Sequence, residues 1–418
     1  MGAHVDMRRR LCLTGGAVAA ASFGLGPRFL LRAAAAATPS RDAVLVAIFQ
    51  RGAVDGLNMI VPHGEGRYYD ARRTIAVPRP GAGAGAALDL DGFFALHPAM
   101  ARLAPAFAAG ELAIVHACGS PDPSRSHFDA QDYMETGQPG DRSALDGWLN
   151  RHLESAPEPG ASTVRAVALS SQMPRALSGA APALATTTLT QVAFGPPGQG
   201  ALARAAVERM YATRDDLLGR TTRDALASLD VFGRLDGAAS PPAKGAVYPS
   251  TELGNQLREV ARVIKGKVGL EIAFLNTGGW DTHVLEGGSD GQLAGLLRDL
   301  ADALAAFRID LGDEMARVCV LTMSEFGRTL EENGSGGTDH GRATAMMLLG
   351  GGVAGGRVYG RWPGLAPEQL FEGRDLAVTT DFRSLFAEVL VHHLGNPDVA
   401  SVFPDFAYDV KQRLGVIA

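Results

Sequence analysis

Residues 43–49 read AVLVAIF and are followed at once by Gln50-Arg51-Gly52. A strand with one face in water alternates apolar and polar residues, whereas a strand covered on both faces is apolar throughout. Ala43–Phe49 therefore predicts a strand inside a sheet that is covered on both sides. Further short apolar runs follow along the chain: Leu112–Cys118, Val164–Leu169, Leu270–Leu275, Val318–Met323 and Ala345–Leu349.

Stretches with helical periodicity lie between these apolar runs. In Gln292–Leu311, leucine and phenylalanine recur with the period of an α-helix, about 3.6 residues. The other predicted helices are Pro98–Ala109, His127–Glu135, Leu202–Arg214, Glu252–Lys265 and Arg383–Leu394. Strands that alternate with helices predict an α/β fold, in which a mostly parallel sheet is flanked by helices on both faces.

The composition is that of a large globular protein. The chain has 418 residues, 46% hydrophobic and 20% charged, so it can bury a large core in one domain with excursions. The formal net charge is −6 and no block of basic residues follows the N-terminal region, which argues against nucleic acid as a partner. Cys118 and Cys319 lie in apolar runs. They can form a disulfide or remain buried thiols, and we favour buried thiols.

The N-terminal residues have the features of an export signal. Arg8-Arg9-Arg10 precedes the weakly apolar stretch Thr14–Leu31, and small residues follow at Ala33–Ala37. Paired arginines are typical of a twin-arginine signal, which the twin-arginine export machinery reads. The alternative is a single membrane anchor, but glycine and proline interrupt the apolar stretch. We therefore expect an export signal over residues 1–37 and a domain over 38–418. The mature protein is expected to be periplasmic or secreted, with no stable membrane anchor after signal cleavage.

Acidic and imidazole side chains collect where the predicted strands end, and ligands of open α/β sheets bind beyond the carboxyl ends of the strands. They follow the first, fourth and fifth apolar runs or lie in a Gly-rich loop: Asp55, Asp281, His283, Glu325, Asp339 and His340. Carboxylate oxygens and imidazole nitrogens bind divalent cations. We expect these residues to hold one or two divalent cations, zinc first, with Ca, Mg or Mn as alternatives. Each residue alone could instead be a solvated loop or capping residue.

A serine lies where the helix after the second apolar run begins. Ser126 precedes the predicted helix His127–Glu135, and the free N–H groups and dipole of a helix N-terminus favour an anion. This is a suitable place for a nucleophile, with Arg125 and His127 beside it to balance charge or to act as ligand or acid. The alternative is that Ser126 only caps the helix.

Two glycine-rich motifs do not have the context that their usual function requires. Gly287–Gly291 matches the nucleophile-elbow pattern around Ser289, but a polar loop stands where that elbow needs a strand. Gly350–Gly355 matches a dinucleotide fingerprint, but residues 357–363 cannot open the helix that would bind the pyrophosphate. A serine esterase is therefore a third-ranked alternative, and a nucleotide-dependent dehydrogenase is rejected.

A set of segments together resembles one known family: RGAVDGLN (51–58), SPDPSRSHFDAQDYMETG (120–137), GWDTH (279–283), SEFGRTLEENGSGGTDHG (324–341), GGRVYGRWPG (355–364) and TDFRSLFAEVL (380–390). They resemble the exported bacterial family catalogued as domain of unknown function 1501, placed with the alkaline phosphatase and sulfatase superfamily. The resemblance covers about Ala43 to Gly395. It implies an alkaline phosphatase-like fold with a metal centre at the carboxyl edge of the sheet, for a family without an assigned reaction.

The resemblance also implies roles for single residues. Asp55 resembles the N-terminal metal-binding aspartate of the relatives, and Asp339 and His340 resemble their late Asp-His pair, which serves the same metal. Asp281 and His283 resemble the ligands of a second metal, although relatives usually space that pair by four positions rather than two.

Ser126 resembles the nucleophile that starts a helix in the relatives. The third imidazole that they carry late in the chain has no evident counterpart, because the His392-His393 pair lies in an apolar-periodic terminal helix. Either His127 or Glu325 substitutes for it, or the second metal site is degenerate. The sulfatase signature is imperfect, since Pro121 stands at the position of the modified cysteine, and this argues against a sulfatase specifically.

Two hypotheses follow. The first is an exported metal-dependent hydrolase of phosphate or sulfate esters, in which Ser126 attacks a small anionic ester while Arg125 and the helix N-terminus hold the anion. The second is a non-catalytic exported binding or assembly protein that keeps the phosphatase-like fold.

Overall fold

Strand β1 (Val44–Gln50) forms at the first apolar run, and every one of its residues is buried. The computed structural model describes residues 42–418 except 82, 159–161, 190–199 and 238–240, so the predicted export signal over residues 1–37 lies outside the described residues. The other apolar runs also form strands, namely β5 (Leu112–Gly119), β6 (Ala166–Leu169), β8 (Ile272–Thr277), β9 (Val318–Met323) and β12 (Thr344–Gly350).

These strands belong to a nine-stranded sheet with the order β13-β5-β12-β9-β1-β8-β6-β7, in which β14 also pairs with β5. The shorter members are β7 (Leu184–Thr186), β13 (Arg357–Tyr359) and β14 (Thr380–Asp381). Strand β1 is parallel to both of its neighbours, with Leu45 opposite Ile272 of β8 and Cys319 of β9. Strand β12 runs antiparallel to β5 and β9. The predicted mostly parallel sheet is thus confirmed.

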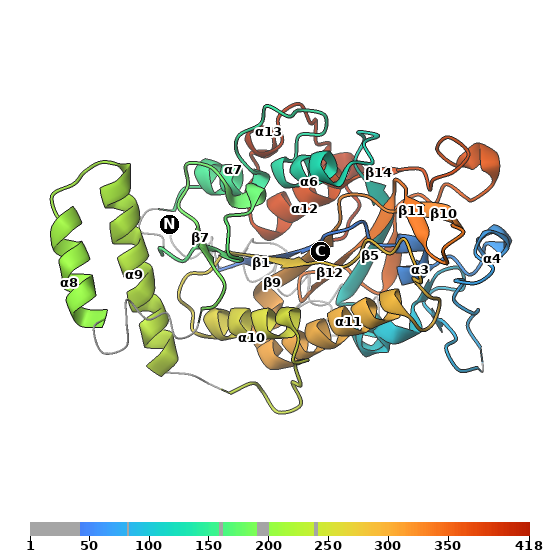
Figure 1. The fold of residues 1–418 in the computed structure, drawn as a ribbon, viewed down its shortest axis with the longest axis horizontal. Helices are drawn as coiled ribbons and strands as arrows, with labels where there is room; N and C mark the ends of the chain where they lie inside the picture. Colours follow the sequence, from blue (N-terminus) through green and yellow to red (C-terminus); the bar gives the residue numbers. More distant parts are fainter. Residues whose placement is uncertain (1–41, 82, 159–161, 190–199, 238–240) are drawn as a thin grey trace, which may run out of the picture. The chain divides into compact units, whose positions relative to one another are not determined.

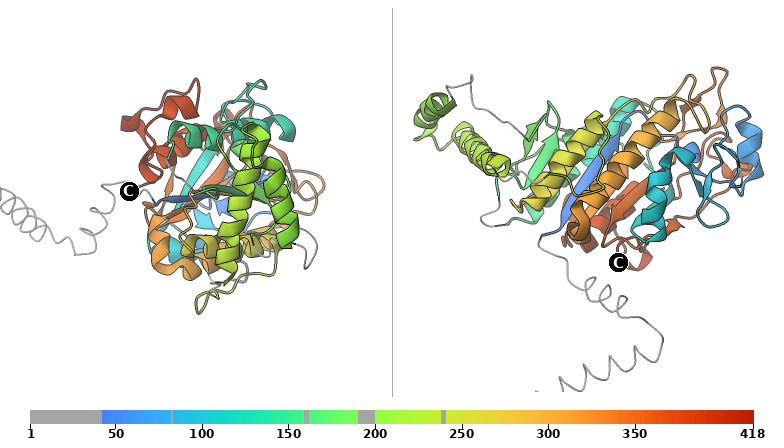
Figure 2. Two further views of the ribbon diagram at one scale, coloured as in Figure 1. Left: turned by 90° about the vertical axis from the view of Figure 1, so that its left-hand side faces the viewer. Right: turned by 90° about the horizontal axis from the view of Figure 1, so that it is seen from below.

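Helices cover both faces of the sheet (Figure 1). One face carries α10 (Glu252–Lys265), α11 (Gln292–Leu311), η1 (Pro98–Leu103) and α5 (Ala104–Ala108), and Figure 2 shows α10 and α11 side by side across it. The other carries α6 (His127–Thr136), α7 (Trp148–Ser155), α12 (Phe382–Glu388) and α13 (Val399–Val402). Val46 and Ile48 pack in the core on the first side, whereas Leu45 and Ala47 pack in the core on the second. Burial on both faces explains the continuous apolar run of β1.

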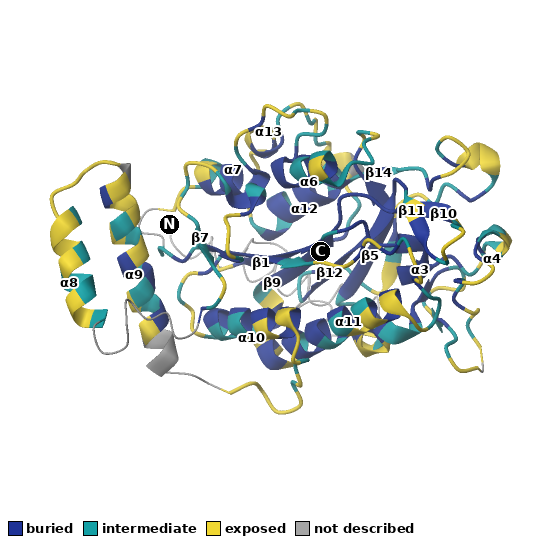
Figure 3. Ribbon diagram, viewed as in Figure 1, coloured by how far each residue is buried: buried dark blue, intermediate teal, exposed yellow. Residues whose placement is uncertain are grey.

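Two predicted helices differ in extent from the structure. Leu202–Arg214 forms α8 (Gly200–Tyr211), which packs along α9 (Leu217–Gly237), a helix that the sequence analysis did not predict. Helix α8 buries none of its residues, and it is drawn as exposed and intermediate in Figure 3. The predicted helix Arg383–Leu394 begins as α12 and continues in a wider π turn, η5 (Val389–His393).

Smaller elements surround the carboxyl edge of the sheet. Helices α3 (Gly56–Met59) and α4 (Gly66–Ala71) follow β1, and β2 (Ile60–Val61), β4 (Ala95–Leu96) and β3 (Leu88–Asp89) form a small antiparallel sheet. The remaining short turns are η2 (Arg175–Leu177), η3 (Gly312–Arg317), η4 (Pro367–Gln369) and η6 (Val410–Gln412).

The antiparallel direction of β12 brings one more segment to the carboxyl edge. Because β12 runs antiparallel to its neighbours, its first residues, rather than its last, lie at the same edge of the sheet as the carboxyl ends of β1, β8 and β9. The residues just before it form a two-stranded hairpin, β10 (Arg328–Glu332) and β11 (Thr338–His340), with Arg328 opposite His340. Asp339 and His340 therefore lie in a strand, not in the Gly-rich loop that the sequence analysis expected.

Several smaller predictions are also settled. Cys118 and Cys319 are free and buried, as favoured above. After β12 the chain turns into strand β13 instead of a helix, which agrees with the rejection of the dinucleotide motif. The Ser289 hydroxyl donates to the Gly85 carbonyl at 2.6 Å. None of the helices among the described residues has the length and apolar character needed to cross a membrane.

Candidate metal centre

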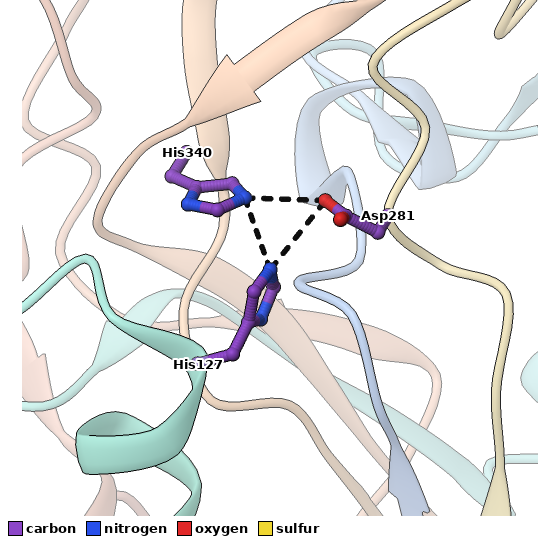
Figure 4. A group of neighbouring side chains, drawn as sticks. All are labelled: His127, Asp281 and His340. Carbon is purple, nitrogen blue, oxygen red and sulfur yellow. Dashed lines mark hydrogen bonds and ion pairs between the residues drawn. The ribbon is translucent and has the colours of Figure 1, made fainter.

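Three side chains from different elements converge at the carboxyl edge of the sheet (Figure 4). His127 is the first residue of α6, Asp281 lies in the loop after β8, and His340 ends β11. The Nε2 atoms of His127 and His340 are 3.0 Å apart, and Asp281 Oδ1 lies 3.5 Å from the first and 3.2 Å from the second. These ligand atoms all lie within 4.8 Å of one another, so the three residues could hold a metal ion.

His283 lies beside this group. Its Nε2 atom is 2.9 Å from His340 Nε2 and 3.0 Å from Asp281 Oδ1. Asp281 and His283 lie in a tightly turned part of the loop after β8, where the His283 N–H donates to the Asp281 carbonyl at 3.0 Å, and both side chains reach one place. The group therefore offers three candidate ligands, with a third imidazole next to them.

The His127 ring is fixed from behind by Glu325. His127 Nδ1 is 2.8 Å from Glu325 Oε1, and the same oxygen accepts from Gln131 Nε2 and from the Gly52 backbone N–H, each at 2.8 Å. The Glu325 side chain is fully buried. A carboxylate can only accept, so Nδ1 of His127 carries the proton and the lone pair of the neutral ring is on Nε2. The structure therefore places Glu325 behind the candidate ligand His127 and not among the candidate ligands themselves, where the sequence predicted it.

The other two imidazoles are held in the same way. His283 Nδ1 is 3.1 Å from Asp339 Oδ1, and His340 Nδ1 is 3.0 Å from the Arg125 backbone carbonyl. Each neutral ring therefore also presents the lone pair of Nε2. Ligating histidines in metal sites almost always donate their other N–H to a carboxylate or carbonyl, which fixes tautomer and ring orientation. Asp339, which is more than half exposed, acts here as an acceptor for His283 and lies outside the three-residue group.

The spacing of the donors fits a small tetrahedral cation. Two nitrogens that are each 2.0–2.1 Å from a tetrahedral zinc ion lie about 3.3 Å apart. The distances within the group, 3.0, 3.2 and 3.5 Å, scatter around that value. Two imidazoles and one carboxylate are also a ligand set that zinc accepts, with one position left open.

Arg328 fixes Asp281 from the side of the sheet. The guanidinium is fully buried, and its Nη2 donates to Asp281 Oδ1 at 2.5 Å and to the carbonyls of Gly52 and Trp280. Burial alone would raise the pKa of Asp281, but the hydrogen bond and positive charge of Arg328 outweigh it and leave the pKa below its ordinary value. Asp281 is therefore an ionised carboxylate with a fixed orientation.

The two histidines of the group differ in electrostatic environment. The hydrogen bond from His127 to Glu325 raises the pKa of His127, against the effect of burial. Burial lowers the pKa of His340, and the neighbouring His127 lowers it further. The two rings therefore have opposite tendencies to carry a proton although their Nε2 atoms face each other.

Asp55 does not join this group, although the sequence predicted it as a metal ligand. Its side chain is fully buried and forms an ion pair with Arg72, which donates from both Nη1 and Nη2, and the Leu57 N–H donates to it as the N-cap of α3. Burial raises the pKa of Asp55, but the charge and hydrogen bonds of Arg72 are stronger, so the net pKa is lowered. A carboxylate neutralised in this way has little tendency to bind a second cation.

Ser126 occupies the N-cap position of α6 but does not cap the helix with its side chain. Its hydroxyl makes no hydrogen bond within the part of the chain that the structure describes, and it is partly exposed. The guanidinium of the neighbouring Arg125 is already hydrogen-bonded to two carboxylates. Its Nη2 donates to Glu372 at 2.7 Å and to Asp375 at 2.6 Å, and its Nε donates to Asp375. The capping alternative for Ser126 is therefore not what the structure shows, and Arg125 is less available to an anion than expected.

Four residues around the site were missed by sequence analysis. Gln131 lies one helical turn after His127, and this i,i+4 spacing was visible in the sequence. Arg328 belongs to the quoted SEFGR segment, but its burial against Asp281 could not be read from it. Arg72 and Glu286 lie outside every motif, and only the fold brings them together.

The fold and this group define an α/β protein with a candidate metal centre at the carboxyl edge of a mostly parallel sheet. A profile of the family described as Protein of unknown function (DUF1501) matches residues 42–398, and the chain belongs to that family, as its motifs indicated. No curated protein sequence matches the chain.

Among solved structures, the phosphonate monoester hydrolase of Agrobacterium radiobacter is similar to this chain. The two share 10% sequence identity, with 77% of this chain and 70% of that chain covered, at a TM-score of 0.28. A similarity at this level does not bear on activity, which has to be inferred from the site itself.

Proposed function

We propose that this chain is a metal-dependent hydrolase of phosphate or sulfate esters with Ser126 as its nucleophile. The observation that carries the proposal is the arrangement of His127 and His340, whose Nε2 lone pairs face each other at 3.0 Å beside the Asp281 carboxylate. Lone pairs at this distance repel, and a cation between them removes the repulsion.

His127, His340 and Asp281 would hold the cation, and their mixed nitrogen and oxygen donors favour zinc over calcium or magnesium, which prefer oxygen. When bound there, a divalent cation supplies a Lewis acid that polarises an ester oxygen and lowers the pKa of a nearby hydroxyl. Three protein ligands with one open position are typical of catalytic zinc sites.

Ser126 is next to the ligand His127 and presents its hydroxyl at the N-terminus of α6. In this proposal Ser126 Oγ forms a bond to phosphorus or sulfur while the bond to the alcohol leaving group breaks. Water then releases the acid from the serine, so one difficult displacement is divided into two. The free N–H groups of the first helical turn favour the negative charge of the ester.

The experiment is metal analysis of the purified protein, followed by turnover of aryl phosphates, phosphodiesters and aryl sulfates. Wild type is compared with Ser126→Ala and with Ser289→Ala, a serine whose hydroxyl is bonded to the Gly85 carbonyl away from the centre. The proposal expects zinc-dependent turnover that is lost in Ser126→Ala and retained in Ser289→Ala. A serine esterase acting through Ser289 would instead hydrolyse a carboxylic ester in the presence of chelator, and Ser289→Ala would lose that activity.

A non-catalytic binding or assembly protein is the second candidate. It is favoured by the position of His283, which as a fourth ligand would close the coordination shell, and by Arg125, whose charge is balanced by Asp375 and Glu372. Bound metal without turnover of any of the three ester classes would support this second candidate.

Export remains part of the proposal. The twin-arginine pattern at Arg8-Arg9 supports a periplasmic or secreted location, reached through the twin-arginine machinery. Fractionation of cells that carry wild type or Arg8→Lys/Arg9→Lys tests this, and retention of the double variant in the cytoplasm is expected.

A further inference from the structure

A second group of titratable side chains is buried behind the candidate metal centre, and the proposed reaction does not use it. Glu286 follows β8 in the loop that leads to α11, and its side chain is fully buried. Glu286 lies next to the buried ion pair of Asp55 and Arg72. The charge of Asp55 raises the pKa of Glu286, and the charge of Arg72 lowers it. A buried carboxyl group needs a structural or chemical reason to be there.

One oxygen of Glu286 joins the two segments that carry the ligands. Glu286 Oε2 accepts from the Thr282 hydroxyl at 3.1 Å and from the Thr338 hydroxyl at 2.7 Å. Thr282 lies between Asp281 and His283, and Thr338 precedes His340 by two residues. The Thr338 N–H also donates to the Thr282 carbonyl at 3.1 Å. The loop after β8 and the strand β11 are therefore fastened to each other through Glu286.

The other oxygen of Glu286 has no hydrogen-bond donor beside it among the described residues. This oxygen, Oε1, is buried, and a side-chain hydrogen bond joins Glu286 to Asp55. Two ionised carboxylates cannot share a hydrogen bond, so one of them must carry a proton. Asp55 is ionised, because both of its oxygens accept from Arg72. Burial and the Asp55 charge raise the pKa of Glu286 well above its ordinary value, so the proton belongs to Glu286.

We propose that Glu286 is a positioning residue of the metal centre, which donates from Oε1 to Asp55 and holds Thr282 and Thr338 through Oε2. The buried ion pair of Asp55 and Arg72 thereby anchors the ligands indirectly. This inference rests on the metal centre of the proposed function, but not on its hydrolytic activity. It also gives Asp55 a role behind the centre in place of the ligand role that the sequence predicted.

The experiment measures the affinity of the demetallated protein for Zn²⁺ by competition with a chromophoric chelator. Glu286→Gln replaces the protonated acid with an amide that can still donate to Asp55 and accept from both threonines. Glu286→Ala removes both interactions. The matched control is Glu271→Ala, which removes another largely buried glutamate, bonded to His152 and Arg165 at the opposite end of β8.

We expect Glu286→Ala to weaken Zn²⁺ binding by about 10- to 100-fold, the usual loss when a group that orients metal ligands is removed. Glu286→Gln should bind Zn²⁺ nearly as tightly as wild type, and Glu271→Ala should lose stability but not affinity. Equal losses in Glu286→Gln and Glu286→Ala would overturn the inference, and so would wild-type affinity in Glu286→Ala.

Two further measurements keep the inference testable if Glu286→Ala does not fold or the wild type shows no hydrolysis. Thr338→Val removes one of the two hydroxyl donors to Glu286 and should weaken Zn²⁺ binding in the same direction. The infrared carbonyl band of a buried protonated carboxylic acid should be present in wild type and missing in Glu286→Gln, with or without metal. Its absence from wild type would overturn the inference, whereas absent hydrolysis with intact Zn²⁺ binding would count only against the proposed function.

Discussion

His127 Nδ1 lies 2.8 Å from Glu325 Oε1, although the two residues are 198 positions apart in the sequence. The contact joins the N-terminus of α6 to the loop that follows β9. It fixes the tautomer of His127 and therefore the direction in which its free lone pair points. In a metal centre this kind of contact decides whether a histidine is ready to bind or must first rearrange.

Replacing Glu325 with glutamine tests that contact. Glu325→Gln keeps the shape and an oxygen that can accept from His127, but it removes the charge that holds the ring. We expect Zn²⁺ affinity to fall by about 10- to 100-fold. Glu271→Gln, on the other end of β8, is the control and should keep wild-type affinity. Unchanged affinity in Glu325→Gln would show that the ring is oriented without the carboxylate.

Metal binding should also stabilise the fold. A ligand that binds only the folded state adds about 3 kcal/mol to the free energy of unfolding when its free concentration is 100 times its dissociation constant. Urea unfolding with and without excess Zn²⁺ measures this, and His340→Ala should abolish the difference. His63→Ala is a matched control, because His63 also faces a carboxylate, that of Asp89, at 3.1 Å. A Zn²⁺ effect that persists in His340→Ala would place the metal elsewhere.

The role of His283 separates a catalytic centre from a structural one. If three ligands hold the cation, His283→Ala should retain most of the Zn²⁺ affinity and leave a position open for substrate. If His283 completes a closed set of four, the same variant should lose affinity as severely as His340→Ala. Zn²⁺ titrations of both variants distinguish the two, and the proposed hydrolase requires the first result.

Much of the fold followed from the sequence because it depends on local pattern. Continuous apolar runs indicated the central strands. Asp281 and His283 come shortly after one of these strands, so the sequence already predicted that they lie at its carboxyl edge. The centre itself was only partly predictable. His127 is adjacent to the predicted nucleophile Ser126, and the sequence allows it to be a ligand or an acid.

The remaining contacts depend on tertiary packing that leaves no local signal. Asp55 follows a strand just as Asp281 does, yet Arg72, 17 residues further on, reaches back and neutralises it. A carboxylate that binds a metal and one that is paired with a buried arginine look identical in the sequence. Glu325 likewise had the residue type of a ligand, and only its burial behind His127 gave it a different role.

The ion pair of Asp55 and Arg72 should contribute strongly to stability once it is formed. Arg72→Met leaves the Asp55 charge buried without its partner, and breaking a buried pair in this way costs about 3–5 kcal/mol. The double variant Asp55→Leu/Arg72→Met removes both charges and should be less destabilised than Arg72→Met alone. Urea unfolding measures both. If the double variant were as destabilised as Arg72→Met or more so, the unpaired charge would not be the cause.

Acid should destabilise the protein through a histidine that is unrelated to the metal centre. His116 is buried in β5, where Nε2 faces the Ile60 carbonyl at 3.1 Å and Nδ1 accepts from the Ala117 N–H at 2.8 Å. Both ring nitrogens are thus satisfied in the neutral form, and a second ring proton would point at an N–H donor. Burial lowers the pKa of His116 to about 4, while the Ile60 carbonyl and the Asp55 charge act in the opposite direction.

The direction of the effect follows from linkage. The unfolded chain takes up a proton near pH 6.5 and the folded chain only near pH 4, so the stabilisation is complete above pH 6.5 and is lost as the pH falls towards 4. The loss amounts to about 3 kcal/mol for this group. His116→Gln should be less stable than wild type at neutral pH but should lose less stability between these values. Because His97 and His393, whose pKa values burial also lowers, are present in both proteins, the difference isolates His116. Urea midpoints that fall in parallel for the two proteins would assign the acid sensitivity to other groups.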